Sequence, residues 1–555
     1  MRARLWGAFA CAFFLLPVVA LVWIGAAGEG PDWAHLARFV LPATLADTAL
    51  LLAGVALVTA IVGTGTAWLV AATEFPGRAW LAAALVLPLT IPTYIAAYVW
   101  VEMLDFAGPV GRALRELGTD WRPEPRSTLG AVLILSSVLY PYVYLTVRVV
   151  FALAGASALE VARTLGAGAG TALRTVALPL ARPAIAAGVT LALLETLNDI
   201  GAVETLGVRT ITWTIYETWL NRGSLAGAGQ LALALLVVVL LLAWIERRSR
   251  RGTARASRDR PMARIRLSGG RAALAFLACA LPFALGFLAP VALMARYALA
   301  RLDDVAEPAL RAAASGSLRV ALAVTVLAVV VVAVTQAARR FSGSRLLALA
   351  DRTATIGYAL PGTVLAIGVL VPLAAFDNAL DAALRPYGWG TGLLLTGSLA
   401  ALVYAIAVRF SAIGHGALAA GFAAISPNVD RAARTLGASP REIVAGVHLG
   451  LMRPALATAA LLVFVDAMKE LPATLLLRPF GLETLATLIY TRGSQGDFEN
   501  AALAALLVVA LGLVPLAVAS RLATGAAVRR TAFRRAPAGR GTGRAPPGSP
   551  APRGS

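Results

Sequence analysis

Apolar stretches long enough to cross a lipid bilayer recur along the whole chain and fall into two groups of six. The first group lies near residues 5–27, 45–73, 79–103, 128–154, 183–205 and 223–245, and the second lies near 272–300, 313–337, 346–376, 391–414, 454–475 and 499–522. Stretches of about 18 or more apolar residues are typical of membrane spans. These stretches are rich in Leu, Ala and Val without period-2 alternation, which favours helices over a β-barrel. The pattern predicts an all-α integral membrane protein with twelve transmembrane helices.

The composition agrees with a membrane protein, and the distribution of charge predicts its orientation. Of the 555 residues, 59% are hydrophobic and 14% are charged, against about 25% charged in a typical soluble domain. The formal net charge of +20 comes from arginines that mostly lie between the apolar stretches. With a cytoplasmic N-terminus, most arginines fall on the cytoplasmic side, as the positive-inside rule requires. We therefore expect a multi-pass protein with both termini in the cytoplasm, in contact with membrane lipid and not with nucleic acid.

Two basic segments lie outside the apolar stretches. Residues 246–271 contain ten arginines together with Gly, Ser and Pro, and residues 524–555 are rich in Arg, Gly, Pro and Ala. The first composition predicts a solvated cytoplasmic linker, and the second predicts a disordered tail. The N-terminal run resembles a signal peptide, but it is long and lacks a clear cleavage site, so we expect an uncleaved first helix.

The chain contains an internal duplication. The string Ala-Arg-Thr-Leu-Gly-Ala occurs at residues 162–167 and again at 433–438, an offset of 271 residues. Three further pairs keep this offset: Arg182 and Arg453, Glu195 and Asp466, and Asp199 and Glu470. Six predicted spans separate the copies, so both copies face the cytoplasm and the halves are parallel repeats. We expect two six-helix transmembrane domains, residues 1–245 and 272–523, related by a pseudo-two-fold axis along the membrane normal.

Each copy of the string lies in a cytoplasmic loop between the fourth and fifth predicted spans of its half. The first loop covers residues 155–182, where Ser157 and Glu160 have the spacing of a capping box and Gly166 is placed to end a helix. A second short helix is expected to run from there toward Pro179.

The second loop covers residues 426–453 and has its own start and stop signals. Ser426 and the proline after it are placed to begin a helix, Gly437 is placed to end it, and Ser439 with Glu442 is placed to cap the next helix. Each loop is thus predicted to be a helix, a glycine turn and a second helix. Short amphipathic helices are common in cytoplasmic loops, but duplication at one membrane depth favours a docking surface.

The first loop resembles the EAA loop of ATP-binding-cassette (ABC) importer permeases. Its Glu160-Val161-Ala162, its Gly166 and its Leu178-Pro179 are similar to the Glu-Ala-Ala, the glycine and the Leu-Pro of that consensus. In that family the loop forms a coupling helix that sits in a groove of the nucleotide-binding subunit. The resemblance implies one coupling site at Glu160, Ala162, Gly166 and Pro179, and another at Ala432, Ala433 and Gly437. The second copy departs from the consensus at Arg431 and Gly450, which implies unequal ATPase contacts.

Further stretches resemble the fused two-domain permeases of ferric iron importers, namely residues 87–92, 104–109, 357–363 and, most specifically, 466–474. The resemblance implies a permease of the bacterial inner membrane that receives ferric iron from a periplasmic binding protein and contacts two copies of an ATPase subunit. The single lysine, Lys469, does not follow a glycine as in a phosphate-binding loop, so ATP and Mg²⁺ are expected in the partner subunit and no cofactor in this chain. Thiamine and phosphonate importers share part of the similarity, and these cargoes are alternatives.

Ionisable side chains within membrane spans are costly and point to function. Glu195 and Asp199 are four residues apart in the fifth predicted span, and Asp466 and Glu470 are four apart in the eleventh, so each pair is expected to share a helix face. The duplication superposes the two pairs, which places four carboxylates around one pathway. Ferric iron is a hard cation that favours oxygen ligands.

Two interpretations of these carboxylates are open. In the first, they line or gate the translocation pathway together with Lys469. In the second, they are structural. Lys469 then neutralises Asp466 or Glu470, while Glu195 and Asp199 pair with arginines at the outer interface or cap a helix that is broken near Gly201 and Pro472.

Two other classes of protein explain less of the sequence. A proton-driven secondary transporter with two parallel halves accounts for the topology and the buried carboxylates, but not for the duplicated EAA-like loops. A membrane-embedded enzyme needs a polar catalytic loop, and the sequence contains neither HExxH nor GxSxG. The three histidines, His35, His415 and His448, have no metal-site spacing. We therefore assign no catalytic residue and no metal ligand.

Overall fold

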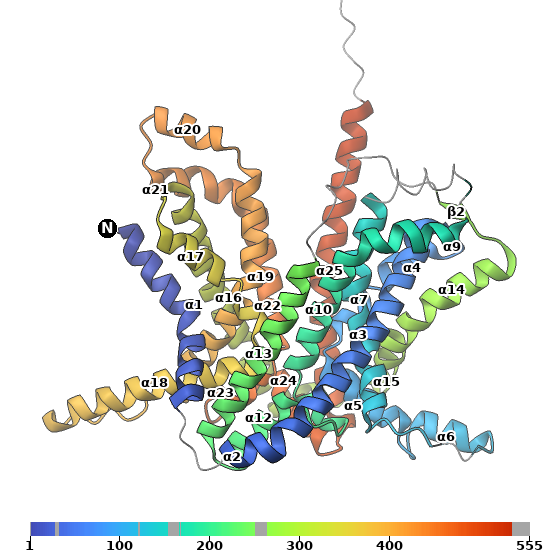
Figure 1. Cartoon of the computed structure of the whole chain (residues 1–555), viewed down its shortest axis with the longest axis horizontal. Helices are drawn as coiled ribbons and strands as arrows, with labels where there is room; N and C mark the ends of the chain where they lie inside the picture. Colours follow the sequence, from blue (N-terminus) through green and yellow to red (C-terminus); the bar gives the residue numbers. More distant parts are fainter. Residues whose placement is uncertain are drawn as a thin grey trace, which may run out of the picture. The chain divides into compact units, whose positions relative to one another are not determined.

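Figure 1 shows the computed structural model of the chain, which describes residues 2–27, 33–119, 122–153, 166, 168–249 and 264–535. Its contacts divide the chain into two compact units, residues 1–512 and 513–555. The described residues are almost entirely helical, which confirms the predicted all-α fold class.

The first half of the chain ends with α13. Its elements are α1 (Arg2–Ala27), α2 (Trp33–His35), η1 (Leu36–Val40), α3 (Leu41–Ala72), β1 (Thr73–Glu74), α4 (Arg78–Ala84), η2 (Leu87–Thr90), α5 (Thr93–Leu104), α6 (Pro109–Glu116), α7 (Thr128–Leu153), α9 (Ala169–Ala172), η3 (Leu173–Ala177), α10 (Leu178–Asn198), α11 (Gly201–Thr205), α12 (Ile211–Leu220) and α13 (Leu225–Ser249).

The second half repeats much of this order. Its elements are β2 (Ile265–Arg266), α14 (Gly269–Phe283), η4 (Ala284–Leu288), α15 (Ala289–Ala300), η5 (Leu302–Ala306), α16 (Pro308–Phe341), α17 (Arg345–Thr353), η6 (Gly357–Ala359), α18 (Gly362–Leu384), η7 (Arg385–Tyr387), α19 (Leu399–Ala424), α20 (Pro427–Thr435), α21 (Pro440–Ile443), η8 (Val444–His448), α22 (Leu449–Met468), α23 (Pro472–Leu477), α24 (Leu485–Ser494) and α25 (Phe498–Arg535).

Eleven helices of the described chain are long and apolar enough to cross a membrane, and a bent pair supplies a twelfth. The pair consists of Arg78–Thr90 and Thr93–Glu116, which are bent by 96°. The total matches the twelve predicted spans when the pair counts as one span.

Two predicted spans are divided near their start. The predicted span 79–103 begins as the separate helix α4, followed by η2 and α5, and the predicted span 346–376 divides in the same way into α17, η6 and α18. Pro92 and Pro361 stand just before the later helix in each case. A proline disfavours helical angles in the residue before it and has no N–H to donate, so one helix ends there and another begins.

Four helices in the described part of the chain contain a π-helical turn, and proline explains three of these turns. Pro42, Pro179 and Pro290 each follow two residues after the turn, in η1, η3 and η4. Proline cannot donate to the carbonyl one turn earlier and its ring displaces that carbonyl, so the hydrogen-bond ladder slips by one residue. The turns η3 and η8 occupy the same repeat position, at the entry of α10 and α22, although Gly450 replaces the proline in the second copy.

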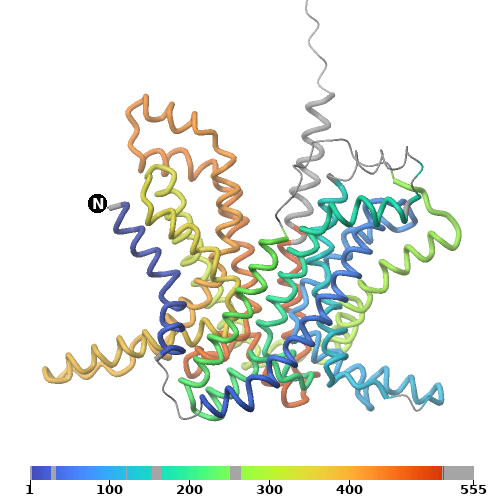
Figure 2. The backbone as a smooth tube through the Cα atoms, viewed as in Figure 1, coloured from blue at the N-terminus to red at the C-terminus, as the bar shows by residue number. Residues whose placement is uncertain are grey.

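The first helix of each half packs against the other half. Helix α1 lies against α17 and α18, and Tyr404 on α19 donates a hydrogen bond to the carbonyl of Phe13 at 2.8 Å. Helices α14 and α15 lie along elements of the first half, and Tyr297 donates to Glu102 Oε1 at 2.9 Å. Figure 2 shows the same exchange in the backbone trace. Hydropathy does not predict this feature, because it identifies spans but not their neighbours.

A pair of two-residue strands departs from the helical pattern. Strand β1 pairs in parallel with β2. Glu74 accepts a hydrogen bond from Arg78, which is the main reason that the pKa of its carboxyl is lowered, and Arg264 lies 3.3 Å from its Oε2. The end of the predicted linker 246–271 is therefore ordered against the first half, contrary to the prediction, while residues 250–263 lie outside the described part of the chain.

Helix α25 is longer than the last predicted span. It continues to Arg535 and so includes residues 524–535 of the predicted tail. These residues are rich in Ala and Arg, which are strong helix formers. The rest of the predicted disordered tail, residues 536–555, lies outside the described residues.

The crossing of α3 and α7 provides a test of the packing. A Cβ built on Gly63 would lie 2.6 Å from Val143 Cβ and 2.8 Å from the Tyr140 carbonyl oxygen, whereas one on Gly65 has no neighbour within 4 Å. We expect Gly63→Val to lower the free energy of unfolding by about 1–3 kcal/mol through overpacking. Gly65→Val is the matched control on the same helix. Thermal unfolding in detergent measures both, and equal losses would contradict this crossing.

Candidate translocation site and coupling loops

The fifth and eleventh predicted spans are both broken at the same place in the repeat. Two residues separate α10 from α11, and three residues separate α22 from α23. Asp199 and Glu470 lie in these breaks, whereas Glu195 and Asp466 lie on α10 and α22. The prediction that each pair shares one helix face is therefore wrong. Asp199 has an extended backbone (φ −85°, ψ 115°), and Pro472 has no N–H with which to continue a helix.

The carboxylates in the breaks cap the short helices that follow. Asp199 Oδ1 accepts a hydrogen bond from the N–H of Ala202 at 2.8 Å. Glu470 accepts from the N–H groups of Ala473 and Thr474 at 2.9 and 3.0 Å, and from the Thr474 hydroxyl at 2.7 Å. In the membrane no water is available to satisfy the first N–H groups of a helix, so a side chain must do so. The contact of Asp199 is the cap near Gly201 that the structural interpretation includes, whereas the sequence does not predict the cap made by Glu470.

Two cations lie beside the carboxylates. Arg409 Nη1, from α19, is 3.5 Å from Glu470 Oε1, and only 4% and 1% of these two side chains are exposed. Lys469 Nζ is 2.8 Å from Asp466 Oδ1. Removing one partner of a buried ion pair is strongly destabilising, because the other charge is left uncompensated. The buried pair of Arg409 and Glu470 is therefore part of the structure of the breaks, whereas the side chains of Lys469 and Asp466 are 30% and 25% exposed.

These groups surround one cavity of about 80 Å³ that both halves of the chain line. Its charged lining consists of Glu195, Asp199, Arg409, Asp466, Lys469 and Glu470. Tyr358, from η6, also lines the cavity and donates a hydrogen bond to Glu195 Oε1 at 2.5 Å. The structure thus brings together all five residues that the sequence selects within the membrane.

Two residues of the cavity, Arg409 and Tyr358, are missing from the sequence-based selection. Arg409 is an isolated charge in the predicted span 391–414, and the rule that selects the buried carboxylates would also have selected it. The role of Tyr358 depends on the contact between η6 and α10, which no sequence pattern reveals.

The cavity offers an electrostatic preference but no coordination shell. Among the residues that the structure describes, no group of three or more His, Cys, Asp or Glu side chains is placed to hold a metal ion. Four acidic and two basic groups line the cavity, so the acidic groups are in excess. At short range and low dielectric such an excess attracts cations and repels anions.

The second coupling loop has the predicted helix–turn–helix form. The Ser426 side chain accepts from the backbone at the start of α20, and a full capping box joins Ser439 and Glu442 at the start of α21. Gly437 has a positive φ of 84°, as expected of a glycine that ends a helix. Ala432 and Gly437 are exposed and Ala433 is half-buried.

Asp430 fastens α20 to the helices below it. Its Oδ2 is 2.6 Å from Arg340 Nε on α16, and its Oδ1 is 2.7 Å from Nε2 of the buried His448 in η8. Burial would raise the pKa of Asp430, but the hydrogen bonds and charges of Arg340 and His448 outweigh it and lower that pKa. The other nitrogens of Arg340 donate to the carbonyls of Phe422 and Ile425, which closes the end of α19.

The first coupling loop is described only in part. Gly166 has a positive φ of 86°, in agreement with its copy in the second loop. Pro179 is exposed and is the second residue of α10. Glu160 and Ala162 lie outside the described residues.

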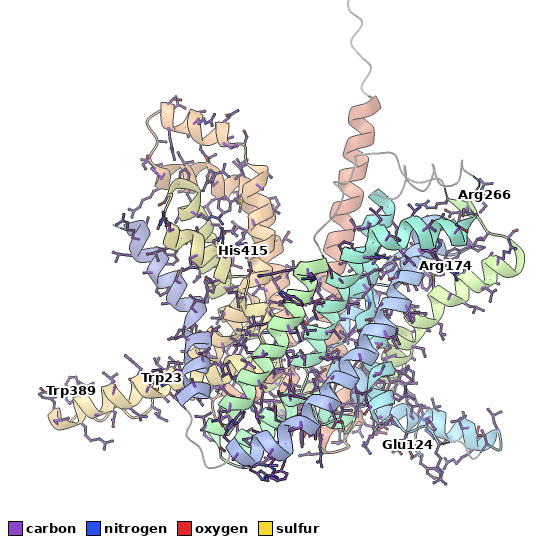
Figure 3. All side chains as sticks on the ribbon, in the orientation of Figure 1. Trp23, Glu124, Arg174, Arg266, Trp389 and His415 are labelled. Atoms are coloured by element: carbon purple, nitrogen blue, oxygen red, sulfur yellow. The ribbon has the colours of Figure 1, made fainter. Side chains whose placement is uncertain are left out.

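The histidines hold helices together. His415, labelled in Figure 3, is 2.9 Å from Asp351 Oδ1, and Arg339 also pairs with this aspartate. These contacts tie α19 to α17 and α16. His448 contacts Asp430 and thereby helps to hold α20, as described above.

Both halves of the chain match one protein family. Residues 63–251 and 329–532 each match the family described as binding-protein-dependent transport system inner membrane component. A relative, the Fe(3+)-transport system permease protein FbpB 2 of Haemophilus influenzae, is 25% identical over 481 residues, which cover 85% of this chain and 88% of the relative.

Other relatives match a shorter part of the chain. The molybdenum transport system permease protein ModB of Escherichia coli is 30% identical over 199 residues, which cover 33% of this chain and 84% of the relative. The sulfate transport system permease protein CysT of Salmonella typhimurium is 29% identical over 196 residues, which cover 35% of this chain and 70% of the relative.

The helical fold, the membrane spans and the duplicated match define an integral membrane permease with two copies of one domain. The chain belongs to the family of binding-protein-dependent transport system inner membrane components. Its relatives are permease subunits, which are transport proteins and not enzymes.

The anchor of α20 can be tested by exchange of its backbone hydrogens. Asp430→Asn removes the charge that Arg340 faces, and hydrogen bonds to charged groups are worth about 1.5–3 kcal/mol. We expect hydrogen–deuterium exchange in α20 to become at least about tenfold faster, since 1.4 kcal/mol is tenfold in an equilibrium constant. Arg431→Ala, an exposed change on the same helix, is the control and should leave exchange nearly unchanged. Equal exchange in wild type and Asp430→Asn would show that the pair does not hold the helix.

Proposed function

We propose that this protein is the permease subunit of an ABC importer that moves ferric iron into the cytoplasm. In this proposal a periplasmic binding protein delivers the cargo to the chain in the bacterial inner membrane. Two copies of an ATPase subunit, which bind ATP and Mg²⁺, dock on the loops at residues 155–182 and 426–453. Both termini lie in the cytoplasm, on the same side as these loops.

The observation that carries the coupling proposal is the shape of the second loop. Helix α20 has no buried residue, and Leu436 at its tip is 87% exposed, although its base is fixed by Asp430. An exposed leucine on a firmly held helix is suited to fill an apolar groove of a partner. The same string of residues recurs in the first loop, so a pair of partner subunits is the simplest assembly.

Two observations support ferric iron as the cargo. The relative named for Fe(3+) transport aligns with both halves of this chain, whereas the relatives named for molybdenum and sulfate align with about a third of it. The excess of acidic groups around the cavity also favours a cation over an oxyanion. Thiamine, another cation, is the alternative cargo, and a phosphonate is disfavoured by the same charge. The duplicated loops argue against a proton-driven secondary transporter.

The coupling proposal predicts that the loss of uptake depends on which residue replaces Gly437. Nothing lies within 4 Å of a Cβ built there, so substitutions act through the positive φ and not through a clash. Asn tolerates this conformation and a β-branched residue does not. The variants are expressed in iron-starved cells that lack the chromosomal gene. We expect Gly437→Val to reduce uptake of radiolabelled ferric iron at least about tenfold relative to wild type, which corresponds to a loss of about 1.4 kcal/mol in coupling free energy. Gly437→Asn should retain most of the uptake.

The possible results distinguish the proposal that the cargo is iron from the proposal that this loop couples transport to the ATPase. Unchanged iron uptake in the deletion strain, with no redundant system present, would exclude iron and make thiamine the next cargo to test. Iron uptake that is lost in the deletion strain but equal in wild type and Gly437→Val would support iron and contradict coupling through this loop. A parallel substitution, Gly166→Val, tests the first loop in the same way.

The pathway proposal predicts that neutral isosteres of two cavity carboxylates block transport. Glu195→Gln combined with Asp466→Asn removes the charges of the two carboxylates on α10 and α22 while keeping their shape. We expect uptake to fall at least about tenfold while the yield of assembled transporter stays normal. Glu217→Gln combined with Asp304→Asn, at two ion pairs outside the cavity, is the matched control. Normal uptake in the cavity variant would contradict a role of these charges in the pathway.

A further inference from the structure

The two helix breaks are joined across the repeat by a small set of hydrogen bonds. Asn198, at the end of α10 in the first half, accepts with its Oδ1 from the N–H of Gly362 at 2.7 Å and from Arg409 Nη1 at 2.6 Å. Both donors belong to the second half. Arg409 is also paired with Glu470, so one buried guanidinium contacts the breaks of both halves.

A second layer of contacts between the halves lies next to α11. Tyr490, on α24, donates to Glu204 Oε2 on α11 at 2.6 Å, and Tyr98, on α5, donates to the carbonyl of Tyr490 at 3.4 Å. This layer is closely packed at two glycines. A Cβ on Gly493 would lie 2.7 Å from the Tyr98 ring, and one on Gly201 would lie 3.0 Å from a leucine side chain of the second half.

The charged groups around the cavity differ in their exposure to solvent. Helices α10 and α22 run from the loops to the breaks, so Asp466 lies on the loop side of Glu470. The side chains of Asp466 and Lys469 are 25% and 30% exposed, whereas those of Arg409 and Glu470 are 4% and 1% exposed. The ion pair of Asp466 and Lys469 is therefore partly open to solvent, whereas the pair of Arg409 and Glu470 is buried.

The two halves are not equivalent at this point. At the repeat offset Asn198 corresponds to Lys469, and Arg409 corresponds to Val138. A lysine in place of Asn198 would face Arg409 and repel it. The neutral asparagine instead offers an acceptor oxygen, which allows one arginine to hold the breaks of both halves.

We propose that Arg409, Asn198 and the N–H of Gly362 form a latch that closes the translocation pathway on the face opposite the coupling loops. Opening of that face separates the break of the first half from α18 and α19, and it requires Arg409 to release Asn198. Arg409 keeps Glu470 as its counter-ion during this step, so no buried charge is left alone. The inference rests on the proposed permease function, but it does not depend on the cargo.

The latch can be tested by the reactivity of a cysteine in the cavity. Cys11 and Cys279 are first replaced by Ala, and Leu139, which lines the cavity and has a buried side chain, is replaced by Cys. A membrane-impermeant methanethiosulfonate is then added to sealed vesicles whose outer face is the face opposite the loops. We expect slow labelling with the latch intact and at least fivefold faster labelling with Asn198→Ala. Labelling in denaturant shows that the cysteine itself is reactive.

A matched variant separates the latch from a general loss of structure. Asn198→Asp keeps an acceptor oxygen for both donors, so its labelling should stay at the slow rate. Asn198→Leu, which keeps the side-chain volume, should label as fast as Asn198→Ala, and size-exclusion chromatography with thermal unfolding shows whether each variant is folded. Slow labelling of folded Asn198→Leu, or equally fast labelling of Asn198→Asp, would overturn the proposal. No ATP, ATPase subunit or iron is present, so these outcomes are independent of the cargo and of coupling.

Discussion

The arrangement of this protein depends on one constraint, which is that backbone groups at membrane depth must find partners within the protein. The fifth and eleventh predicted spans are interrupted there, and each interruption exposes the first N–H groups of a short helix. Asp199 and Glu470 satisfy these groups with carboxylate oxygens. A carboxylate buried in this way needs compensation, which Arg409 provides for Glu470. The charged cavity is thus a consequence of the broken helices, and the same groups that complete the fold line the space between the halves.

Fusion of the two halves into one chain permits differences that two identical subunits could not have. The carboxylates are duplicated, but both cations of the cavity belong to the second half. The anchor of α20 is also specific to the second half, because Leu159 stands at the repeat position of Asp430. Each difference gives one half of the chain a contact that the other half lacks. Two identical subunits would either both make such a contact or both lack it. A second arginine at Val138 would crowd the cavity with like charge, whereas a single arginine bonds both breaks.

Local sequence signals predict the parts of this protein that depend on local chemistry. Hydropathy predicts the number of spans, and the serine, proline and glycine signals predict the second coupling loop, including the positive φ of Gly437. The exchange of first helices and the contact between Tyr358 and Glu195 depend on which helices meet, and no local signal carries that information. The helix breaks lie between these cases, since Pro472 signals one break directly while Asp199 resembles an ordinary helical position in the sequence.

The anchor of the second coupling helix and the breaks lie at the two ends of one continuous helical segment. The segment from Pro440 through η8 to Met468 is unbroken, and at 1.5 Å per residue its 29 residues span about 43 Å. Its loop end is fixed to α20 through His448 and Asp430, and its other end leads into Glu470, which faces Arg409. A force applied to α20 therefore acts on a rigid lever whose far end carries the counter-ion of Arg409. Because packed helices shift as units and do not deform continuously, a displacement of the loop end of this segment is transmitted to the geometry around Arg409.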